Sequence, residues 1–438
     1  MDAYRAEIIY CTNDPSKFGE SSICHFEDGL LVVNSSGEIV ACGEAKTLLK
    51  EWGGNCSYNE YKNHLIVPGF IDSHIHFPQT EMLAAHGEQL LSWLENYTYP
   101  VEENFCDKSY SLKIANIFLT ELLKNGTTSA VVFGSVHKES VDALFELSYE
   151  KNMRIIAGKA LMDRNVPFGV RENTLDGFIK SKELIDQWHN KGRLSYAVTP
   201  RFAASSSYEQ LDGCKKLLND YPDLYLQTHL SENHEEIDFV KKTYPTFQNY
   251  LSIYDEFDFL GRPSIFAHCI HLEKKEWDLM SNSKAAISHC PTSNLFLGSG
   301  LFDMKKSRSF DIPVSLGTDI GAGTSFSMMQ TFSEAYKIQQ LQGTSLNGFD
   351  GLYLMTLAGA KAINLDHRIG TLEAGTEADF VILNYNSTPY MEFRNSKCDT
   401  IHDRLFSLLM LGDDRAVSET YIMGKKKFDQ SNCNDTYL

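Results

Sequence analysis

The sequence contains no CxxC pair, although its 438 residues include ten cysteines, which are spread singly along the chain. The residues after Met1 also lack the basic segment followed by an apolar run that marks a secretory signal. Single cysteines without such a signal are typical of reduced thiols. We therefore expect a cytoplasmic protein without a disulfide framework.

Long apolar runs and an excess of positive charge are missing as well. No uninterrupted apolar stretch approaches the roughly 20 residues that a membrane helix needs. The 40 Lys and Arg residues are outnumbered by 58 Asp and Glu residues, which gives a formal net charge of -18. Because an acidic surface repels phosphate backbones, we expect neither a membrane nor a nucleic acid as partner, and a small neutral substrate fits better.

No internal repeat and no Gly/Ser-rich linker divides the chain, yet its ends and its middle differ in pattern. Both ends contain short β-type runs separated by Gly, Ser and Asn turns. Because neither end holds enough strands for a core of its own, we predict that the two ends meet in one small β-sandwich. The predicted domains are residues 1–67 and 371–438, which form the sandwich together, and residues 68–370, which form a barrel.

The middle of the chain alternates short apolar runs with helical stretches, which is the pattern of βα units. Eight strands are predicted, at Ile66–Ile75, Thr128–Phe133, Arg154–Lys159, Leu194–Val198, Leu224–His229, Ser264–His268, Ala285–His289 and Val314–Asp319. Eight such units indicate an α/β protein with a (β/α)8 barrel of the TIM type. Metal-competent polar residues end the first, fifth, sixth, seventh and eighth of these strands, and active sites of this barrel lie at that face.

Three histidines and one carboxylate form the predicted metal site. His74 and His76 are two residues apart on one strand, so both imidazoles can point to the same side. His229 ends the fifth predicted strand and Asp319 ends the eighth. This ligand set is suited to zinc with a water molecule in an open position.

Glu232 lies three residues after His229, at the start of a predicted helix. A histidine that binds a metal, with a nearby carboxylate that moves protons, is a recurrent pair in hydrolases. The same segment also suits a helix N-terminus with Ser231 as its N-cap. At the ends of strands six and seven, His268 and His289 could both be structural; we favour His268 as a group that orients the reacting atoms and leave the role of His289 open.

These motifs together resemble the amidohydrolase superfamily. The resemblance rests on PGFIDSHIH, THLSE, the strand-end His268, SHCPTSN, LGTDI and the later IGTLEAG and EADF segments. Narrower elements resemble the guanine deaminases within it: HFPQ with Gln79, WLENYTYP with Trp93, and TPRF with Arg201 and Phe202. Tyr99 stands where that family commonly has Phe, and Cys269-Ile270 where Gly-Cys is expected.

The resemblance implies hydrolytic deamination of guanine at C2, with xanthine and ammonia as products. It implies one zinc ion per chain on His74, His76, His229 and Asp319, because Thr199-Pro200-Arg201 offers no bridging lysine or acid for a second metal. Asp319 would accept a proton, Glu232 would protonate a ring nitrogen, and His268 would steady the tetrahedral centre. Arg201 and Gln79 would recognise guanine between the aromatic walls Phe202 and Trp93. The resemblance also implies a homodimer.

Two alternatives remain at this stage. A related deaminase that acts on 8-oxoguanine, a pterin or a triazine would share the metal ligands but need different groups at Gln79 and Arg201. A non-catalytic scaffold on the same fold is the second alternative, since fold alone does not fix function. Such scaffolds usually lose metal ligands, whereas the full set is present here.

Overall fold

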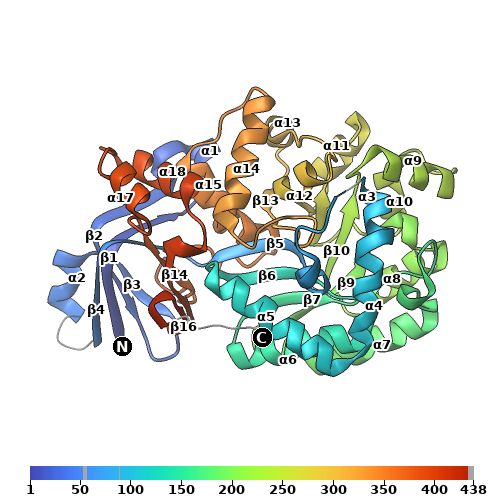
Figure 1. Cartoon of the computed structure of the whole chain (residues 1–438), viewed down its shortest axis with the longest axis horizontal. Coiled ribbons are helices and arrows are strands. Elements are labelled where there is room, and N and C mark those ends of the chain that lie inside the picture. The colour runs from blue at the N-terminus through green and yellow to red at the C-terminus, as the bar shows by residue number, and fades with distance from the viewer. Residues whose placement is uncertain (53–56, 88, 433–438) are drawn as a thin grey trace.

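The computed structural model describes residues 1–52, 57–87 and 89–432. Its larger part is a ring of eight parallel strands in the hydrogen-bonded order β13-β12-β11-β10-β9-β7-β6-β5 (Figure 1). These strands are β5 (Phe70–His76), β6 (Thr127–Phe133), β7 (Arg154–Gly158), β9 (Ser195–Pro200), β10 (Tyr225–Leu230), β11 (Ser264–His268), β12 (Ala286–His289) and β13 (Val314–Leu316); the short β8 (Ala160–Leu161) pairs with β9. The predicted α/β barrel is confirmed.

Hydrogen bonds beyond the last strand bring the two ends of this sheet together. The amide of Asp319 donates to the carbonyl of His74 at 2.9 Å, and the amide of His76 donates to the carbonyl of Ile320 at 2.9 Å. The Ser73 hydroxyl adds a 2.8 Å bond to the carbonyl of Leu316. The segment after β13 is therefore held directly against the end of β5, which places Asp319 beside the two histidines of that strand.

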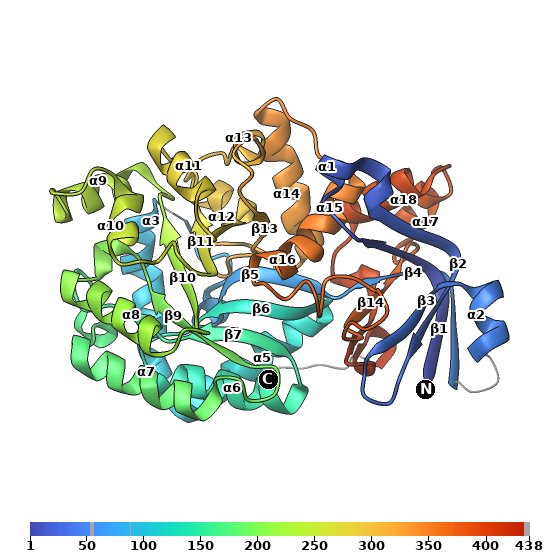
Figure 2. The same ribbon diagram turned by 180° about the vertical axis from the view of Figure 1, so that it is seen from behind.

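Helices surround the barrel on its outer side, as expected for βα units (Figures 1 and 2). They are α5 (Lys108–Lys124), α6 (Lys138–Lys151), α7 (Thr174–Trp188), α8 (Tyr208–Asp220), α9 (His234–Thr243), α10 (Tyr250–Glu256), α11 (Lys274–Ser281), α12 (Pro291–Phe296), α13 (Met304–Ser309), α14 (Met328–Leu341), α15 (Gly348–Met355) and α16 (Leu357–Ala362). The amino end of the barrel is filled by apolar side chains, among them Ile71 and Val131, against Ala360 and Ile363. The predicted metal-competent residues lie at the opposite, carboxyl end of the strands.

The two ends of the chain share one seven-stranded mixed sheet, in the order β16-β15-β14-β4-β1-β2-β3. Its strands are β1 (Asp2–Cys11), β2 (Ile23–Val33), β3 (Ile39–Glu44), β4 (Ser57–Pro68), β14 (Phe380–Asn384), β15 (Val417–Ile422) and β16 (Lys425–Asp429); α1 (Pro15–Phe18), α2 (Ala45–Trp52), α17 (Pro389–Asn395) and α18 (Ile401–Leu411) accompany it. Tyr4 of β1 contacts the ring of Tyr421 on β15, with centroids 5.1 Å apart, although two strands lie between them. The sheet therefore folds over its own apolar core, and the expectation that both ends build one β-domain is confirmed.

The first predicted barrel strand is two strands in the structure. Ile66–Pro68 belongs to β4 and pairs with β14 of the terminal sheet, whereas Phe70 starts β5 of the barrel. Gly69 stands at the break, where a Cβ atom would lie 2.2 Å from the hydroxyl oxygen of Thr128. A continuous run of apolar residues does not reveal such a change of sheet, because both strands are buried.

A buried ion-pair network joins the terminal sheet to the barrel. Glu377 accepts bonds from Arg154 of β7 at 2.6 Å and from Arg193, just before β9, at 2.7 Å. Arg193 also donates to Asp379 at 2.5 Å, and Arg368 lies 2.9 Å from Glu377. Since each carboxylate has partners, the buried charges are compensated across the domain boundary.

Candidate active site

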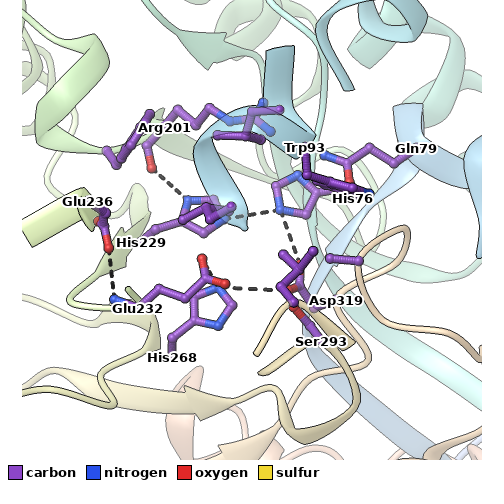
Figure 3. A pocket seen from close by; sticks show the side chains of 15 residues that line it. His76, Gln79, Trp93, Arg201, His229, Glu232, Glu236, His268, Ser293 and Asp319 are labelled. Carbon is purple, nitrogen blue, oxygen red and sulfur yellow. Dashed lines mark hydrogen bonds and ion pairs between the residues drawn. The ribbon is translucent and has the colours of Figure 1, made fainter. Parts of the chain in front are cut away.

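Four of the sequence-predicted residues meet at the carboxyl end of the barrel. His74 and His76 come from β5, His229 from β10, and Asp319 follows β13. Nε2 of His76 lies 3.1 Å from Nε2 of His229 and 3.4 Å from Oδ1 of Asp319 (Figure 3). Nε2 of His74 lies 3.3 Å from the same carboxylate oxygen.

These spacings fit the donor atoms of one metal ion. Ligand atoms placed tetrahedrally at about 2.0–2.1 Å from a zinc ion lie roughly 3.3–3.4 Å from one another. The imidazole nitrogens of His74, His76 and His229 that could ligate lie within 4.8 Å of each other, and all three side chains are buried. Nitrogen and carboxylate donors at this spacing suit a divalent transition metal.

Burial and hydrogen bonding prepare the histidines as neutral ligands. Nδ1 of His229 donates to the backbone carbonyl of Arg201 at 2.7 Å, which leaves the Nε2 lone pair free to face the other ligands. Burial lowers the pKa of His74 and lowers those of His76 and His229 well below the ordinary value. Burial opposes the charge of Asp319 too, but the imidazoles of His74, His268 and His229 that surround its carboxylate lower its pKa to about 2.

Glu232 and His268 lie beside this cluster. Oε2 of Glu232 is 3.4 Å from Nε2 of His268, and the same nitrogen is 3.7 Å from Oδ2 of Asp319. Nδ1 of His268 lies 2.9 Å from Oδ1 of Asn294, an acceptor that assigns the proton to Nδ1. Burial raises the pKa of Glu232, which favours a protonated carboxyl that can donate to a substrate.

The loop that carries Glu232 is held by another acid. Oε2 of Glu236 accepts from the amides of Glu232 at 2.9 Å and Asn233 at 3.2 Å. Asn233 is the N-cap of α9, and Glu236 completes its capping box. The alternative in which Ser231 caps this helix is therefore wrong: Ser231 has a φ of 50°, one of the left-handed conformations that redirect the chain at the site.

Backbone strain is concentrated at this face of the barrel. His268 has a φ of 70°, Cys269 of 53° and Asp319 of 53°, although none of them is glycine. Such conformations cost about 1–3 kcal/mol each and persist where the surroundings fix them, often at active sites. Here they aim two of the clustered side chains at the common centre.

A pocket opens above the cluster and contains every residue predicted to bind substrate. Gln79, Trp93, Arg201 and Phe202 line it together with His76, Leu90, Leu94, His229, Glu232, Glu236, His268, Ser293, Leu297, Asp319 and Ala322. All four predicted residues are at least 94% buried. The pocket thus combines apolar walls, a small number of fixed polar groups and the metal-competent cluster, as small-molecule sites do.

A buried carboxylate that no sequence motif indicated lies behind the pocket. Both oxygens of Glu102 accept from Nη1 of Arg201, at 2.9 and 3.0 Å, and Oε1 accepts from Nε2 of Gln79 at 3.1 Å. Glu102 belongs to α4 (Tyr99–Glu103), which follows α3 (Leu90–Trp93) in the long connection after β5. It stands next to an exposed glutamate, Glu103, and no pattern in the sequence separates the two.

Two further supports of the site were missed as well. The Ser299 hydroxyl donates to Oε1 of Glu232 at 2.9 Å, and Asn294 holds His268 as described above. Asn294 ends the SHCPTSN motif, which was the available signal, whereas Ser299 lies five positions beyond it. The motif marked the region without telling which of its polar residues point inward.

His289, left open above, lies apart from the pocket lining. Its ring stacks on Phe302 with centroids 4.8 Å apart, and burial lowers its pKa to about 3. Neither ring nitrogen has a hydrogen-bond partner among the described residues. The structure assigns it no place in the cluster formed by His74, His76, His229 and Asp319.

Comparison with known proteins gives a consistent result. Residues 65–426 match the model of the Amidohydrolase family. Guanine deaminase from Escherichia coli (strain K12) is 46% identical over 434 residues, covering 98% of each chain. A solved structure of E. coli guanine deaminase superposes with a TM-score of 0.96 at 45% identity, covering 98% of this chain and 100% of that one.

A third comparison concerns a guanine deaminase solved with a ligand. The crystal structure from C. acetobutylicum, with guanine bound in its active site, gives a TM-score of 0.90 at 30% identity and covers 98% of this chain and 100% of that chain. The barrel and the metal-competent cluster define the class of metal-dependent barrel hydrolases. The chain belongs to the Amidohydrolase family, and the relatives named here, over nearly its whole length, are guanine deaminases.

Among the described residues, no helix is both long and apolar enough to cross a lipid bilayer.

Proposed function

We propose that this protein catalyses the hydrolytic deamination of guanine at C2, releasing ammonia and leaving xanthine. The observation that carries this proposal is the pair of buried donors, Arg201 and Gln79, in the wall of the pocket that contains the metal-competent cluster. The similarity to guanine deaminases over 98% of the chain supports it.

Zinc is the metal that the proposal assigns to His74, His76, His229 and Asp319. The donor set and its near-tetrahedral spacing support this choice. We assign one ion per chain because β9 ends in Thr199 and Pro200, where a second metal would need a lysine or an acid as a bridging ligand. When bound, zinc would supply Lewis acidity and lower the pKa of a water molecule to about 7.

The remaining steps belong to the side chains of the chain itself. Asp319, ionised at neutral pH, accepts the proton of the attacking water. Glu232, whose pKa is raised by burial, donates a proton to a ring nitrogen beside C2. Burial opposes a charge on His268, but the carboxylates of Glu232 and Asp319, 3.4 and 3.7 Å from its Nε2, raise its pKa, so that its protonated imidazole steadies the oxygen that develops at the tetrahedral centre. Asp319 then passes its proton to the departing amino group and Glu232 takes the proton of the added hydroxyl, so that collapse of the centre gives xanthine and ammonia.

Specificity for guanine is assigned to the donors on the opposite wall. A guanidinium at Arg201 suits the O6 acceptor of guanine and opposes the amino group of adenine. Gln79 Oε1 accepts from the amide of Gly321 at 3.1 Å, so its amide group faces the pocket in one orientation. Phe202 and Trp93 would enclose the planar base.

A cytoplasmic location and a homodimer remain proposals. The ten cysteines, which are spread singly along the sequence without a CxxC pair, support the first. The second rests on the family resemblance. Size-exclusion chromatography with light scattering would distinguish a dimer from a monomer.

The deciding experiment is a deamination assay on purified, metal-analysed protein, following xanthine and ammonia from guanine with adenine and 8-oxoguanine in parallel. We expect preferential guanine turnover with about one zinc per chain. A zinc-loaded protein that ignores guanine but acts on 8-oxoguanine, a pterin or a triazine would keep the metal site and overturn the roles of Arg201 and Gln79. Zinc-loaded protein without any of these activities would favour the scaffold alternative.

A further inference from the structure

We propose that Glu102 is a positioning residue that sets the charge preference of the pocket, so that the Arg201 edge accepts a neutral carbonyl and disfavours an anion. The inference rests on the proposed function and adds a residue and a chemical criterion to it. Glu102 is not among the residues that line the pocket; it lies behind two that do.

The charge of Arg201 is balanced within the protein. A buried guanidinium without a partner is costly, and it is a strong binding site for carboxylates and phosphates. Here both oxygens of Glu102 accept from a single nitrogen, Nη1, at 2.9 and 3.0 Å. No hydrogen bond between described residues engages Nη2 or Nε of Arg201. The arginine is thus compensated in charge while donor groups remain for a substrate.

The side-chain amide of Gln79 is held in one orientation. Its Nε2 donates to Glu102 at 3.1 Å, and its Oε1 accepts from Gly321 at 3.1 Å. Both ends of the amide are therefore anchored, and one N–H of Nε2 remains for a ligand. Glu102 thus aligns two donors, one charged and one neutral, with a single buried carboxylate.

The consequence concerns the class of molecule that can bind. Because Glu102 balances the charge of Arg201, the N–H groups of Arg201 and Gln79 offer hydrogen bonds without a net positive charge. Such donors suit a neutral acceptor, such as the O6 carbonyl of a 6-oxopurine. An anionic group at the same position would meet an arginine whose charge is already balanced, and it would lose its own hydration. Glu102 therefore contributes to specificity without touching the substrate.

The chain offers a matched control for this residue. Glu103 is adjacent to Glu102 in α4, is exposed, and forms no ion pair with another described residue. Glu103→Gln removes the same charge from the same helix without altering the ion pair. Any effect of lost net charge alone would appear in both variants.

The experiment measures direct binding of two ligands of equal shape, purine-6-carboxamide and purine-6-carboxylate, to the zinc-loaded protein by calorimetry. Glu102→Gln should shift the ratio of the two dissociation constants at least about tenfold toward the carboxylate, relative to wild type. Glu103→Gln should leave the ratio unchanged. Arg201→Gln, which leaves Glu102 unpaired, should shift the ratio in the opposite direction.

Equal weakening of both ligands in Glu102→Gln, with an unchanged ratio, would show a merely structural role and overturn the inference. If that variant does not fold, the direction of the Arg201→Gln shift still decides, because a shift toward the carboxylate or no shift contradicts the proposal. Guanine turnover by the wild type is measured separately. Its absence would count against the proposed function, whereas the ratios test only the charge preference.

Discussion

The backbone carbonyl of Arg201 accepts a 2.7 Å hydrogen bond from Nδ1 of His229. The side chain of the same arginine lines the pocket and pairs with Glu102. One residue thus orients His229, a proposed metal ligand, through its backbone and lines the pocket with its guanidinium. Because the two tasks use different atoms, a side-chain substitution separates them.

Arg201→Ala should therefore lower kcat/KM for guanine by about 10³-fold, since a buried site built to donate a hydrogen bond discriminates strongly once the donor is lost. Zinc content should stay near that of the wild type, because the carbonyl that holds His229 remains. Steady-state kinetics and metal analysis on the same preparation check both statements. Loss of zinc together with activity would contradict the assignment of Arg201 to the substrate.

Ser299→Ala should weaken catalysis without removing the metal. The Ser299 hydroxyl donates to Glu232 at 2.9 Å and lowers the pKa of that carboxyl against the larger, opposite effect of burial. Leaving a buried carboxyl oxygen without its hydrogen-bond partner costs about 1–3 kcal/mol, so we expect kcat/KM to fall roughly fivefold to a hundredfold.

The pH profile of the same variant gives a sharper readout. Without the hydroxyl, the pKa of Glu232 rises further, so the acid form that donates a proton persists to higher pH. The alkaline limb of the profile should therefore move upward in Ser299→Ala relative to wild type. An unchanged or downward-shifted limb would argue against Glu232 as the acid.

The sequence predicted the barrel strands and the metal-competent residues because both are local signals. HxH on one strand and single polar residues at strand ends can be read from spacing alone, as His74, His76 and Asp319 illustrate. Glu102 and Ser299 could not be found in this way. Their roles depend on contacts with Arg201 and Glu232, 99 and 67 positions away in the chain.

The break at Gly69 was missed for a related reason. Ile66 and Ile71 are equally buried, yet they belong to different sheets, and only the pairing partner distinguishes them. The hydrophobic pattern of a sequence predicts which residues are buried, but it does not predict which strand pairs with which. The alternative with Ser231 as N-cap of α9 lies two residues from the observed cap, because Ser231 and Asn233 are both good caps and the left-handed backbone of Ser231 shows only in the structure.

Metal removal should abolish activity and be favoured by acid. Burial lowers the pKa of His76 and His229 well below the ordinary value, so these groups are neutral at pH 7 and bind metal without first losing a proton. A histidine that detaches from the metal and becomes exposed regains its ordinary pKa, so below neutral pH a proton can bind it before the metal does. We expect a chelator to remove zinc faster at pH 5 than at pH 7, as metal analysis over time would show. Added zinc should then restore guanine turnover. Full activity of a metal-free preparation would contradict the proposed site.

Glu377→Ala should destabilise the protein without changing its chemistry. Glu377 is buried and accepts hydrogen bonds or ion pairs from Arg154, Arg193 and Arg368. It is not one of the residues that line the pocket. Removing one partner of a buried ion-pair network typically costs about 3–5 kcal/mol, because the remaining charges are left uncompensated. Urea unfolding should show this loss, while kcat/KM of the folded variant under native conditions stays within about twofold of wild type.

Glu373→Ala, at an exposed glutamate four positions earlier, is the matched control and should change stability by less than about 0.5 kcal/mol. An equal loss of stability in both variants would show that the junction network does not hold the terminal sheet to the barrel.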